Sequence, residues 1–324
     1  MSLTEFSLIE KYFTAHARTR ADVAVGIGDD AAVVDVPAGE QLVVAVDTLV
    51  AGVHFPSSAT PADIGHKALA VNLSDLAAMG ARPCWATLAL TLPQADEAWV
   101  AEFARGFFLL AERYQVELIG GDTTCGPLCV SVQIHGCVPR GQALLRAGAR
   151  VGEHIFVSGS LGDAGLALRL LQTQHACAEE QRAVLDARLH RPEPRVALGE
   201  HLRGLASAAI DVSDGLLADL GHILERSGVG ATVWVDRLPR SAAFRSCVLP
   251  QTPEWFELPL AAGDDYEICF TAAPEQAAAL QTLARELDVP ITAIGVIEAD
   301  AGLRCRNDLG RSFEPARRGY EHFG

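Results

Sequence analysis

The chain has 324 residues, of which 49% are hydrophobic and 21% are charged. These proportions are ordinary for a globular protein and exclude a disordered one. The length exceeds what one hydrophobic core usually organises, so we expect two domains. No apolar run approaches the roughly 18 residues that a membrane-spanning helix needs. The amino-terminal segment 1–6 has an early acid and no basic stretch, which is not the pattern of a signal peptide.

The net charge of −15 argues against nucleic acid or an anionic membrane surface as a partner, because their phosphates would be repelled. The eight cysteines include no CxxC pair. Cys125 and Cys129 lie four residues apart, with Cys137 beyond, a spacing that suits a zinc site poorly. We therefore expect reduced structural thiols and a cytoplasmic protein.

In the first part of the chain, strands alternate with two helices. The apolar run Gln41–Val46 predicts a buried strand that stops at Asp47. Segment Pro61–Met79 predicts a helix, because proline suits a first helical turn and the following Gly80 suits a C-terminal cap. The further predicted elements are a strand at Ala86–Leu92, a helix at Asp96–Tyr114, a strand at Val116–Ile119 and a strand at Leu128–Val138.

A stretch rich in Gly, Arg and Pro without periodicity, Pro139–Gly152, predicts the domain junction. We divide the chain into an amino-terminal domain, 1–138, and a carboxy-terminal domain, 139–324. The second domain opens with strand Ile155–Val157, a Gly-rich turn at Ser158–Gly162 and a helix from about Asp163. The other predicted elements are helices at Asp214–Ser227 and Pro274–Leu287 and strands at Ala231–Val235, Glu267–Thr271 and Ile291–Ile297. The expected fold class is α+β in both domains.

Acidic residues recur beside glycines and at the ends of expected strands, and Asp75 lies inside an apolar helix with Asn72 on the same face. The set comprises Asp29, Asp30, Asp47, Asp75, Asp122, Asp211, Asp214, Asp264, Asp265 and Glu267. A turn or a helix cap explains most of them singly, but a carboxylate inside an apolar helix needs a partner. Acids that converge repel one another unless cations lie between them. Oxygen ligands suit Mg²⁺ or Ca²⁺, and Mg²⁺ bridges carboxylates to nucleotide phosphates.

Common nucleotide-binding and hydrolase motifs fit poorly. Segment Gly26–Ala31 matches the dinucleotide fingerprint formally, but Asp29 and Asp30 would place negative charge where a pyrophosphate must bind. The chain has only two lysines and neither follows a glycine, which excludes a Walker A loop. Ser160 lacks the glycine two residues before it that a nucleophile elbow requires.

Taken in order, the motifs resemble the thiamine-monophosphate kinase branch of the aminoimidazole-ribonucleotide synthetase superfamily. The resemblance rests on Glu5–Ile9, Gly26–Ala31, Asp47–Val50, Gly52–Phe55, Lys67–Gly80, Gly120–Thr124, Asp211–Gly215 and Gly319–Phe323. It implies a two-domain fold whose amino-terminal sheet pairs with that of a second subunit in a homodimer. It also implies ATP-dependent phosphorylation of thiamine monophosphate to thiamine diphosphate, by direct in-line transfer with several Mg²⁺ ions.

The same resemblance implies the residues of the site. The implied Mg²⁺ ligands are Asp29, Asp30, Asp47, Asp75, Asp122, Asp211 and Asp214. The implied ATP contacts are Gly121, Asp122, Arg146 and Ser213, and the implied contacts to thiamine monophosphate are His54, Asp264 and Tyr320. Among these residues, catalysis is assigned to Asp122, Asp214 and Arg146.

The chemistry agrees with these residue types. The acceptor is a phosphate monoester whose second pKa is about 6, so it is largely dianionic at neutral pH and needs no general base. Arg146 could add a bidentate phosphate contact. The sequence departs from the family in two places. Before Asp47, Ala45 and Val46 stand where a Ser or Thr is common, so a metal contact there must use a backbone carbonyl. Asp264 replaces the usual Glu and is one methylene shorter.

Two alternatives remain open. The first is another ATP-using enzyme of the superfamily, such as a selenophosphate synthetase or a hydrogenase-maturation enzyme. Those branches carry a reactive cysteine near one end of the chain, whereas here the first is Cys84 and the last is Cys305. The second is a non-catalytic divalent-cation binding protein, which explains the acids but not Arg146, Ser213 or the Gly-Gly-Asp loop.

Overall fold

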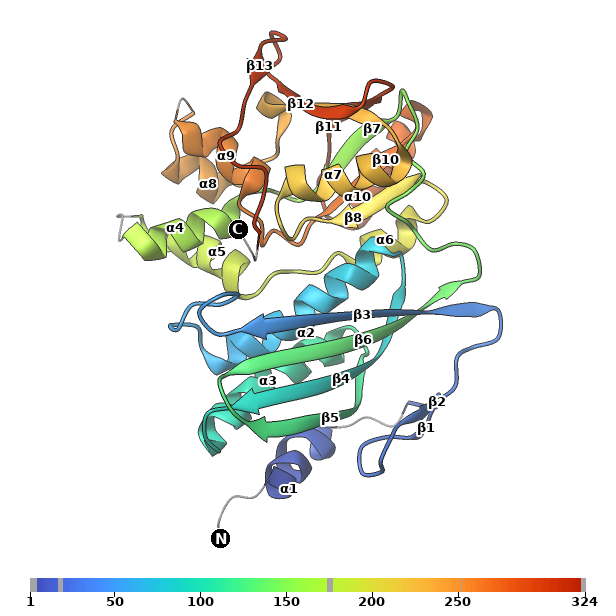
Figure 1. Ribbon diagram of the computed structural model, residues 1–324, viewed down its shortest axis with the longest axis vertical. Coiled ribbons are helices and arrows are strands. Elements are labelled where there is room, and N and C mark those ends of the chain that lie inside the picture. Colours follow the sequence, from blue (N-terminus) through green and yellow to red (C-terminus); the bar gives the residue numbers. More distant parts are fainter. Residues whose placement is uncertain (1–4, 17–19, 174–176, 251, 322–324) are drawn as a thin grey trace. The chain divides into compact units, whose positions relative to one another are not determined.

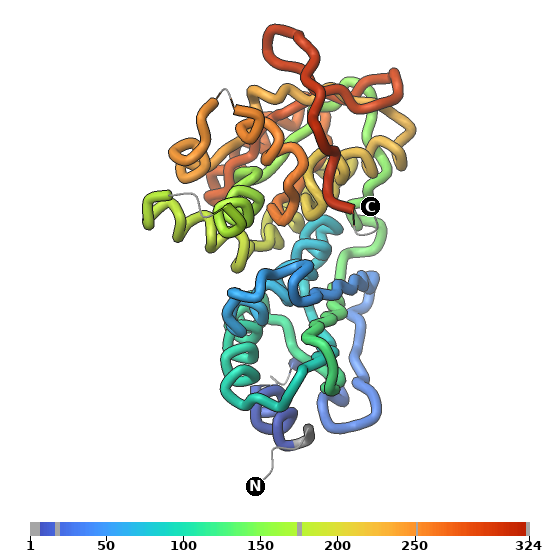
Figure 2. The backbone as a smooth tube through the Cα atoms, turned by 60° about the vertical axis from the view of Figure 1, so that its left-hand side comes forward, coloured from blue at the N-terminus to red at the C-terminus, as the bar shows by residue number. Residues whose placement is uncertain are grey.

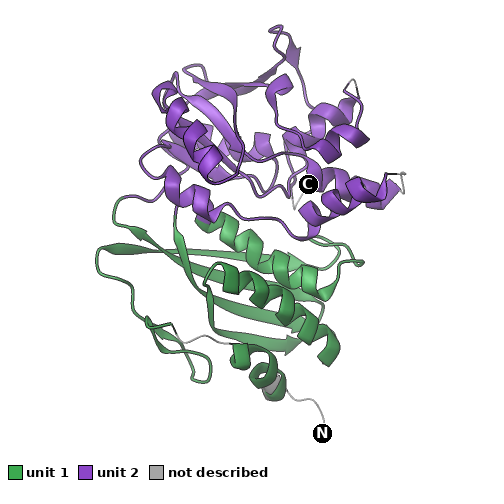
Figure 3. Ribbon diagram, turned by 180° about the vertical axis from the view of Figure 1, so that it is seen from behind, with its two compact units in different colours: residues 1–76, 81–141 green, residues 77–80, 142–324 purple. Residues whose placement is uncertain are grey.

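The computed structural model describes residues 5–16, 20–173, 177–250 and 252–321, and His322 and Phe323 of the family motif lie outside these ranges. The chain divides into two compact units, shown in different colours in Figure 3. Unit 1 comprises Met1–Leu76 and Ala81–Gly141, and unit 2 comprises Ala77–Gly80 and Gln142–Gly324. Within the described ranges, every helix is too short or too polar to cross a bilayer.

Unit 1 is built on a four-stranded sheet in the order β3-β6-β4-β5. Its strands are β3 (Glu40–Val50), β4 (Arg82–Leu92), β5 (Glu117–Cys125) and β6 (Cys129–Pro139). Helices α2 (Pro61–Ala78) and α3 (Glu97–Arg113) cover one face of this sheet (Figure 1). Leu69, Leu73 and Phe103 on these helices are fully buried, so the core of unit 1 lies between helices and sheet.

Smaller elements complete unit 1 before the first long strand. They are α1 (Glu5–Leu8), the π-helical η1 (Ile9–Phe13), the 3-10 helix η2 (Thr14–His16) and the short antiparallel pair β1 (Val23–Val25) and β2 (Val33–Val34). The segment between β1 and β2 carries Asp29 and Asp30.

Unit 2 is built on a seven-stranded sheet in the order β13-β12-β9-β11-β7-β10-β8. The strands are β7 (His154–Ser158), β8 (Ala208–Asp211), β9 (Gly230–Trp234), β10 (Ile268–Ala272), β11 (Ile291–Glu298), β12 (Gly302–Arg306) and β13 (Ser312–Phe313). Ile155 and Val157 join a buried cluster with helix α7 (Leu216–Ser227). Phe156 alternates to the opposite face and stacks on Phe270, with ring centroids 5.4 Å apart.

The other helices of unit 2 form a second cluster and several connections. They are α4 (Asp163–Thr173), α5 (Glu179–His190), α6 (Val196–Leu202), η3 (Val235–Arg237), α8 (Ala242–Cys247), α9 (Pro253–Ala261), η4 (Pro274–Gln276) and α10 (Ala277–Glu286). Buried Leu185 and Phe244 hold α5 and α8 in one apolar cluster with α4. After β13 the chain returns along unit 2 as an extended segment, red in Figure 2.

Four of the predicted element boundaries are wrong. Strand β4 begins at Arg82, four residues before the predicted Ala86. Strand β3 does not stop at Asp47 but continues to Val50, because its ladder with β6 runs on to the pair Val50 and Cys129. Strand β5 does not end before Gly120 but continues to Cys125, paired with β4 on both sides of one register shift between Ala86 and Thr87. Helix α7 begins at Leu216 and leaves Asp214 in the preceding turn.

Candidate active site

Asp122 is exposed within β5, three residues before the strand ends. Its neighbour Gly121 lies so close to β4 that an added Cβ would be 1.9 Å from the carbonyl oxygen of Leu88. Only glycine fits this approach, so Gly121 does not break the strand but allows it to pass β4 closely. Asp122 is thereby fixed by the register of the sheet, opposite Ala89.

Asp29 and Asp30 lie beside β5. They line a cavity of about 860 Å³ together with Gly28, Gly120 and Gly121. Asp29 also accepts a hydrogen bond from the backbone N–H of Asp30, at 2.8 Å. The structure therefore brings two predicted metal ligands next to the predicted nucleotide contact at Gly121.

Asp47 lies on β3, at the other edge of the same sheet. Its backbone N–H donates to Oδ1 of Asn72 at 3.2 Å, and the side-chain amide of Asn72 donates to the carbonyl of Ala68 at 2.9 Å. Fully buried Asn72 thus ties β3 to α2. Asp75 follows one turn later on that helix and is half-buried.

His54 lies in the loop after β3, and the backbone N–H of Val50 donates to its Nδ1 at 3.0 Å. An accepting Nδ1 leaves the other ring nitrogen, Nε2, as the donor of the neutral ring. Lys67, only 2% exposed, donates from Nζ to the carbonyl of His54 at 3.1 Å. A buried lysine on α2 therefore holds the loop that carries the predicted substrate contact.

The sheet order separates these two groups of unit 1. Residue pairing places Asp47 opposite Val132, Val132 opposite Leu88, and Leu88 opposite Gly121. Three strand spacings separate β3 from β5, or about 14 Å. One Mg²⁺ holds its ligands at about 2.1 Å, so a single ion cannot bind both Asp47 and Asp122 of one copy. In the described ranges, the structure gathers no three His, Cys, Asp or Glu side chains into a ready metal site.

In unit 2, one carboxylate holds the turn between β8 and α7. Oδ2 of Asp219 accepts the backbone N–H groups of Ser213, Asp214 and Gly215 at 3.0, 3.1 and 3.1 Å. Asp219 is 3% exposed, and its burial, followed by the charges of Asp211 and Asp214, raises its pKa to about 8. The turn therefore brings several acids close together, and the repulsion between their charges disfavours the ionised forms.

Asp264 and Tyr320 meet the same turn. The backbone N–H of Asp264 donates to the carbonyl of Ser213 at 2.8 Å, and that of Tyr320 donates to the carbonyl of Asp214 at 2.9 Å. Oδ1 of Asp264 accepts from the hydroxyl of Tyr266 at 2.9 Å. The predicted substrate contacts Asp264 and Tyr320 are thus brought together at one turn. The same turn carries the predicted ATP contact Ser213 and the predicted metal ligand Asp214.

Arg146 lies apart from this group. Its carbonyl accepts from the hydroxyl of Ser227 at 3.4 Å, at the C-terminal end of α7. The 12 residues of α7 span about 18 Å, and the turn at Asp214 is at the opposite end of the helix. Within unit 2, Arg146 is therefore not grouped with Ser213 and Asp214.

Comparison with known proteins also divides the chain into two parts. Models of the AIR synthase related protein match residues 28–138 with the N-terminal domain and residues 150–306 with the C-terminal domain. Thiamine-monophosphate kinase of Salmonella typhimurium is 48% identical over 327 residues, spanning 100% of this chain and 99% of the relative. That of Escherichia coli K12 is 46% identical over 325 residues, with the same shares. The chain belongs to the thiamine-monophosphate kinase family.

Solved structures of the family agree. The crystal structure of thiamine-monophosphate kinase from Stenotrophomonas maltophilia K279a matches with a TM-score of 0.88 and 52% identity, covering 97% of this chain and 99% of that one. AaThiL complexed with AMPPCP and TMP matches with a TM-score of 0.79 and 33% identity, covering 100% and 99%. These matches confirm the predicted two-domain α+β fold of the superfamily.

Sequence reasoning missed two residues that shape this family's site in the present chain. Asp219 holds the turn and Lys67 holds the His54 loop. Each is a charged residue within an apolar helix, the signal that made Asp75 stand out. A buried charge needs partners, so the same argument applies to both.

Proposed function

We propose that the chain transfers the γ-phosphoryl group of ATP to the phosphate of thiamine monophosphate. A phosphate oxygen of the acceptor forms the new bond to phosphorus, the bond from phosphorus to the β–γ bridging oxygen breaks, and ADP and thiamine diphosphate result. The observation that carries the proposal is the end-to-end match to a relative complexed with AMPPCP and TMP, at 33% identity. Direct in-line transfer needs no general base, because the acceptor is already largely dianionic.

The acids fit Mg²⁺ as the ion of the site. The candidate ligands are carboxylates, the hard oxygen donors that Mg²⁺ prefers. In unit 2 the buried Asp219 carboxyl lies close enough to Asp211 and Asp214 for their charges to raise its pKa. The ligands would be Asp29, Asp30, Asp47, Asp75, Asp122, Asp211 and Asp214. When bound, Mg²⁺ neutralises phosphate charge and so lets two polyanions approach.

The chain's own residues then bind and orient the two substrates. We assign ATP to Gly121, Ser213 and Arg146, with Arg146 contacting a part of the nucleotide distant from the turn at Asp214. Ser213 and Asp214 are held at fixed positions by Asp219, which limits their movement relative to the transferred phosphate. Thiamine monophosphate is assigned to His54, Asp264 and Tyr320.

We propose a homodimer, for two reasons. Within the described part of the chain, strand β3 pairs with β6 on one side only. It exposes Leu42, Val44 and Val46 by 45, 50 and 63%. An edge strand with exposed apolar side chains favours pairing with another strand. The second reason is that Asp47 and Asp122 occupy opposite edges of the sheet. Pairing of β3 with β5 of a second copy would bring the Asp47 of one chain to the Asp122 of the other.

We also propose the cytoplasm as the compartment. The reaction consumes ATP, and the eight cysteines of the chain are unbridged. Reduced thiols are the rule in that compartment.

The direct test is formation of thiamine diphosphate from ATP and thiamine monophosphate, measured with Mg²⁺ and with excess EDTA. We expect one ADP per thiamine diphosphate with Mg²⁺ and no product with EDTA. Thiamine without its phosphate is the matched control acceptor and should give no turnover. Folded protein that forms no thiamine diphosphate in Mg²⁺ would disprove the proposal. Mg²⁺ binding without Mg²⁺-dependent binding of an ATP analogue would favour the cation-binding alternative.

A further inference from the structure

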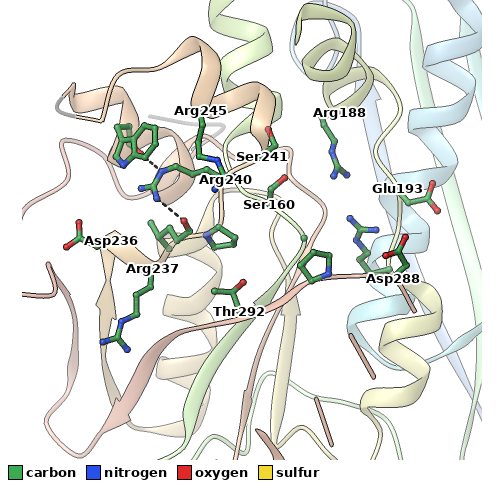
Figure 4. Close-up of a pocket in the computed structure, with 16 residues that line it drawn as sticks. Ser160, Arg188, Glu193, Asp236, Arg237, Arg240, Ser241, Arg245, Asp288 and Thr292 are labelled. Atoms are coloured by element: carbon green, nitrogen blue, oxygen red, sulfur yellow. Dashed lines mark hydrogen bonds between the residues drawn. The ribbon is translucent and has the colours of Figure 1, made fainter. Parts of the chain in front are cut away.

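A second pocket lies wholly within unit 2. It has a volume of about 680 Å³, and none of its lining residues belongs to the predicted ATP, Mg²⁺ or thiamine monophosphate contacts. Five of the 26 basic residues of this acidic chain line it, all of them arginines. In Figure 4, Ser160 and Ser241 lie between Arg240 and Arg245 on one side and Arg188 on the other.

Among the described residues, no carboxylate forms an ion pair with the buried Arg240. It is 7% exposed, and its guanidinium donates to the carbonyls of Trp255, Leu238 and Val235 at 2.9, 2.8 and 3.2 Å. These three bonds use three of its five N–H groups. Burial lowers its pKa to about 10, with Asp236 acting in the opposite direction and Arg245 adding repulsion. Two guanidinium groups therefore lie close enough to repel each other.

Among the described residues, neither Arg245 nor Arg188 donates a side-chain hydrogen bond to a carboxylate, although Arg188 forms two long ion pairs. Arg245 is exposed, and among the described residues no ion pair or side-chain hydrogen bond engages it. Arg188 lies 3.9 Å from Asp163 and 3.8 Å from Glu267, beyond hydrogen-bond distance. Both acids have other partners, since Asp163 accepts two serine hydroxyls and Glu267 pairs with Arg195.

The Gly-rich turn Ser158–Gly162 forms one edge of the pocket, but its backbone is not a phosphate cradle. The N–H groups of Gly159 and Leu161 donate to the carbonyls of Pro290 and Pro239, at 2.9 and 3.0 Å. The N–H of Gly162 donates to Asp265 at 2.8 Å. These three backbone donors of the turn are therefore already engaged, and the arginine side chains supply the positive charge of the pocket.

We propose that this pocket binds a small phosphate-bearing molecule through Arg188, Arg240 and Arg245. Guanidinium groups from two sides of a pocket can reach several oxygens of one phosphoryl group, and arginine is suited to this contact. Glu193, Asp236 and Asp288 also line the pocket. Their charge restricts the ligand to a compact anion seated against the three arginines.

Inorganic pyrophosphate is the probe, titrated calorimetrically into the full chain in excess EDTA. Without Mg²⁺ the clustered acids of the predicted active site repel this anion, so the assay is independent of the proposed kinase activity. We expect saturable binding that Arg245→Gln weakens about tenfold or more, the loss of one charge-assisted hydrogen bond. Arg188→Gln should weaken it in the same direction.

Two controls separate this pocket from other arginines. Arg285→Gln removes an exposed helical arginine of the same unit that does not line the pocket, and Arg146→Gln removes the predicted ATP contact. Both should bind pyrophosphate as the wild type does. Equal binding by Arg245→Gln and wild type, loss of binding in Arg146→Gln, or no saturable binding by the wild type would each overturn the proposal.

Discussion

The two units hold their acids in different ways. In unit 1 the acids lie on separate elements, and strand pairing fixes them: Asp47 opposite Val132 and Asp122 opposite Ala89. In unit 2 the acids Asp211 and Asp214 lie within one turn, and a single buried carboxylate holds that turn by three backbone hydrogen bonds.

This difference shows where the candidate residues of each unit are vulnerable to substitution. In unit 1, many backbone hydrogen bonds between paired strands hold each acid in place. Changing one exposed acid should therefore remove a proposed metal ligand and leave the fold intact. The turn of unit 2 depends on Asp219, so a change there should disturb both stability and function. The following variants are chosen to separate these outcomes.

The largest effect is expected from Asp122→Asn. The side chain is exposed, so the free energy of unfolding should change by less than about 0.5 kcal/mol. Loss of one anionic ligand should lower kcat roughly 10²–10³-fold, the cost of removing one preorganised electrostatic contact. Urea unfolding and thiamine diphosphate formation measure the two quantities, with exposed Asp300→Asn as the matched control. A large loss of stability would contradict the claim that strand pairing, rather than the Asp122 side chain, stabilises this part of unit 1.

The next largest effect is expected from Asp219→Ala, which should differ from Asp219→Asn in both unfolding free energy and KM for ATP. Alanine leaves three N–H groups without their acceptor and should cost about 1–3 kcal/mol of unfolding free energy. It should also raise the KM for ATP roughly tenfold, because Ser213 and Asp214 lose their fixed positions. Asparagine keeps a carbonyl oxygen that can accept the same bonds, so most of both losses should be recovered. Equal behaviour of the two variants would show that the hydrogen bonds do not position the turn.

The raised pKa of Asp219 predicts a pH dependence. Folding raises this pKa from 3.8 to about 8, so the folded state binds the proton more tightly than the unfolded state. The stabilisation is present at low pH and is lost as the pH rises from about 4 through about 8. Without Mg²⁺, the wild type should therefore lose stability relative to Asp219→Asn between pH 6 and about 8.5. Urea unfolding in EDTA at the two pH values tests this, and parallel curves would contradict it.

A smaller effect is expected from Lys67→Met. The substitution keeps an unbranched side chain but removes the donor to the His54 carbonyl. The KM for thiamine monophosphate should rise several-fold while the KM for ATP stays unchanged, because only the loop of the predicted substrate contact is released. Lys11→Met, at the chain's other lysine, which is exposed, is the matched control. A rise in both KM values would indicate general damage to unit 1.

Sequence reasoning predicted much of the fold because the local signals were strong. Helix α2 was predicted to within one residue, from Pro61 at its start and Gly80 beyond its end. The strand predicted at Ile291–Ile297 was likewise placed to within one residue of β11. These features depend on neighbours within a few residues.

The errors arise where contacts between residues distant in the sequence determine the structure. Gly120 and Gly121 appear to end a strand, but Gly121 is required because Leu88 of β4 leaves no room for a Cβ. The role of Asp219 depends on a turn that folds back to it. The placement of β3 and β5 at opposite edges is a property of sheet topology, which no local pattern contains.

The most direct test of the account mixes two inactive variants, Asp47→Asn and Asp122→Asn, and measures thiamine diphosphate formation. If β3 of one copy meets β5 of the other, a mixed dimer contains one site with neither substitution and one with both. Random subunit exchange should then restore roughly a quarter of wild-type activity, since half the dimers are mixed and each has one intact site. No recovery, with exchange verified by mass spectrometry and each variant folded, would contradict the shared site.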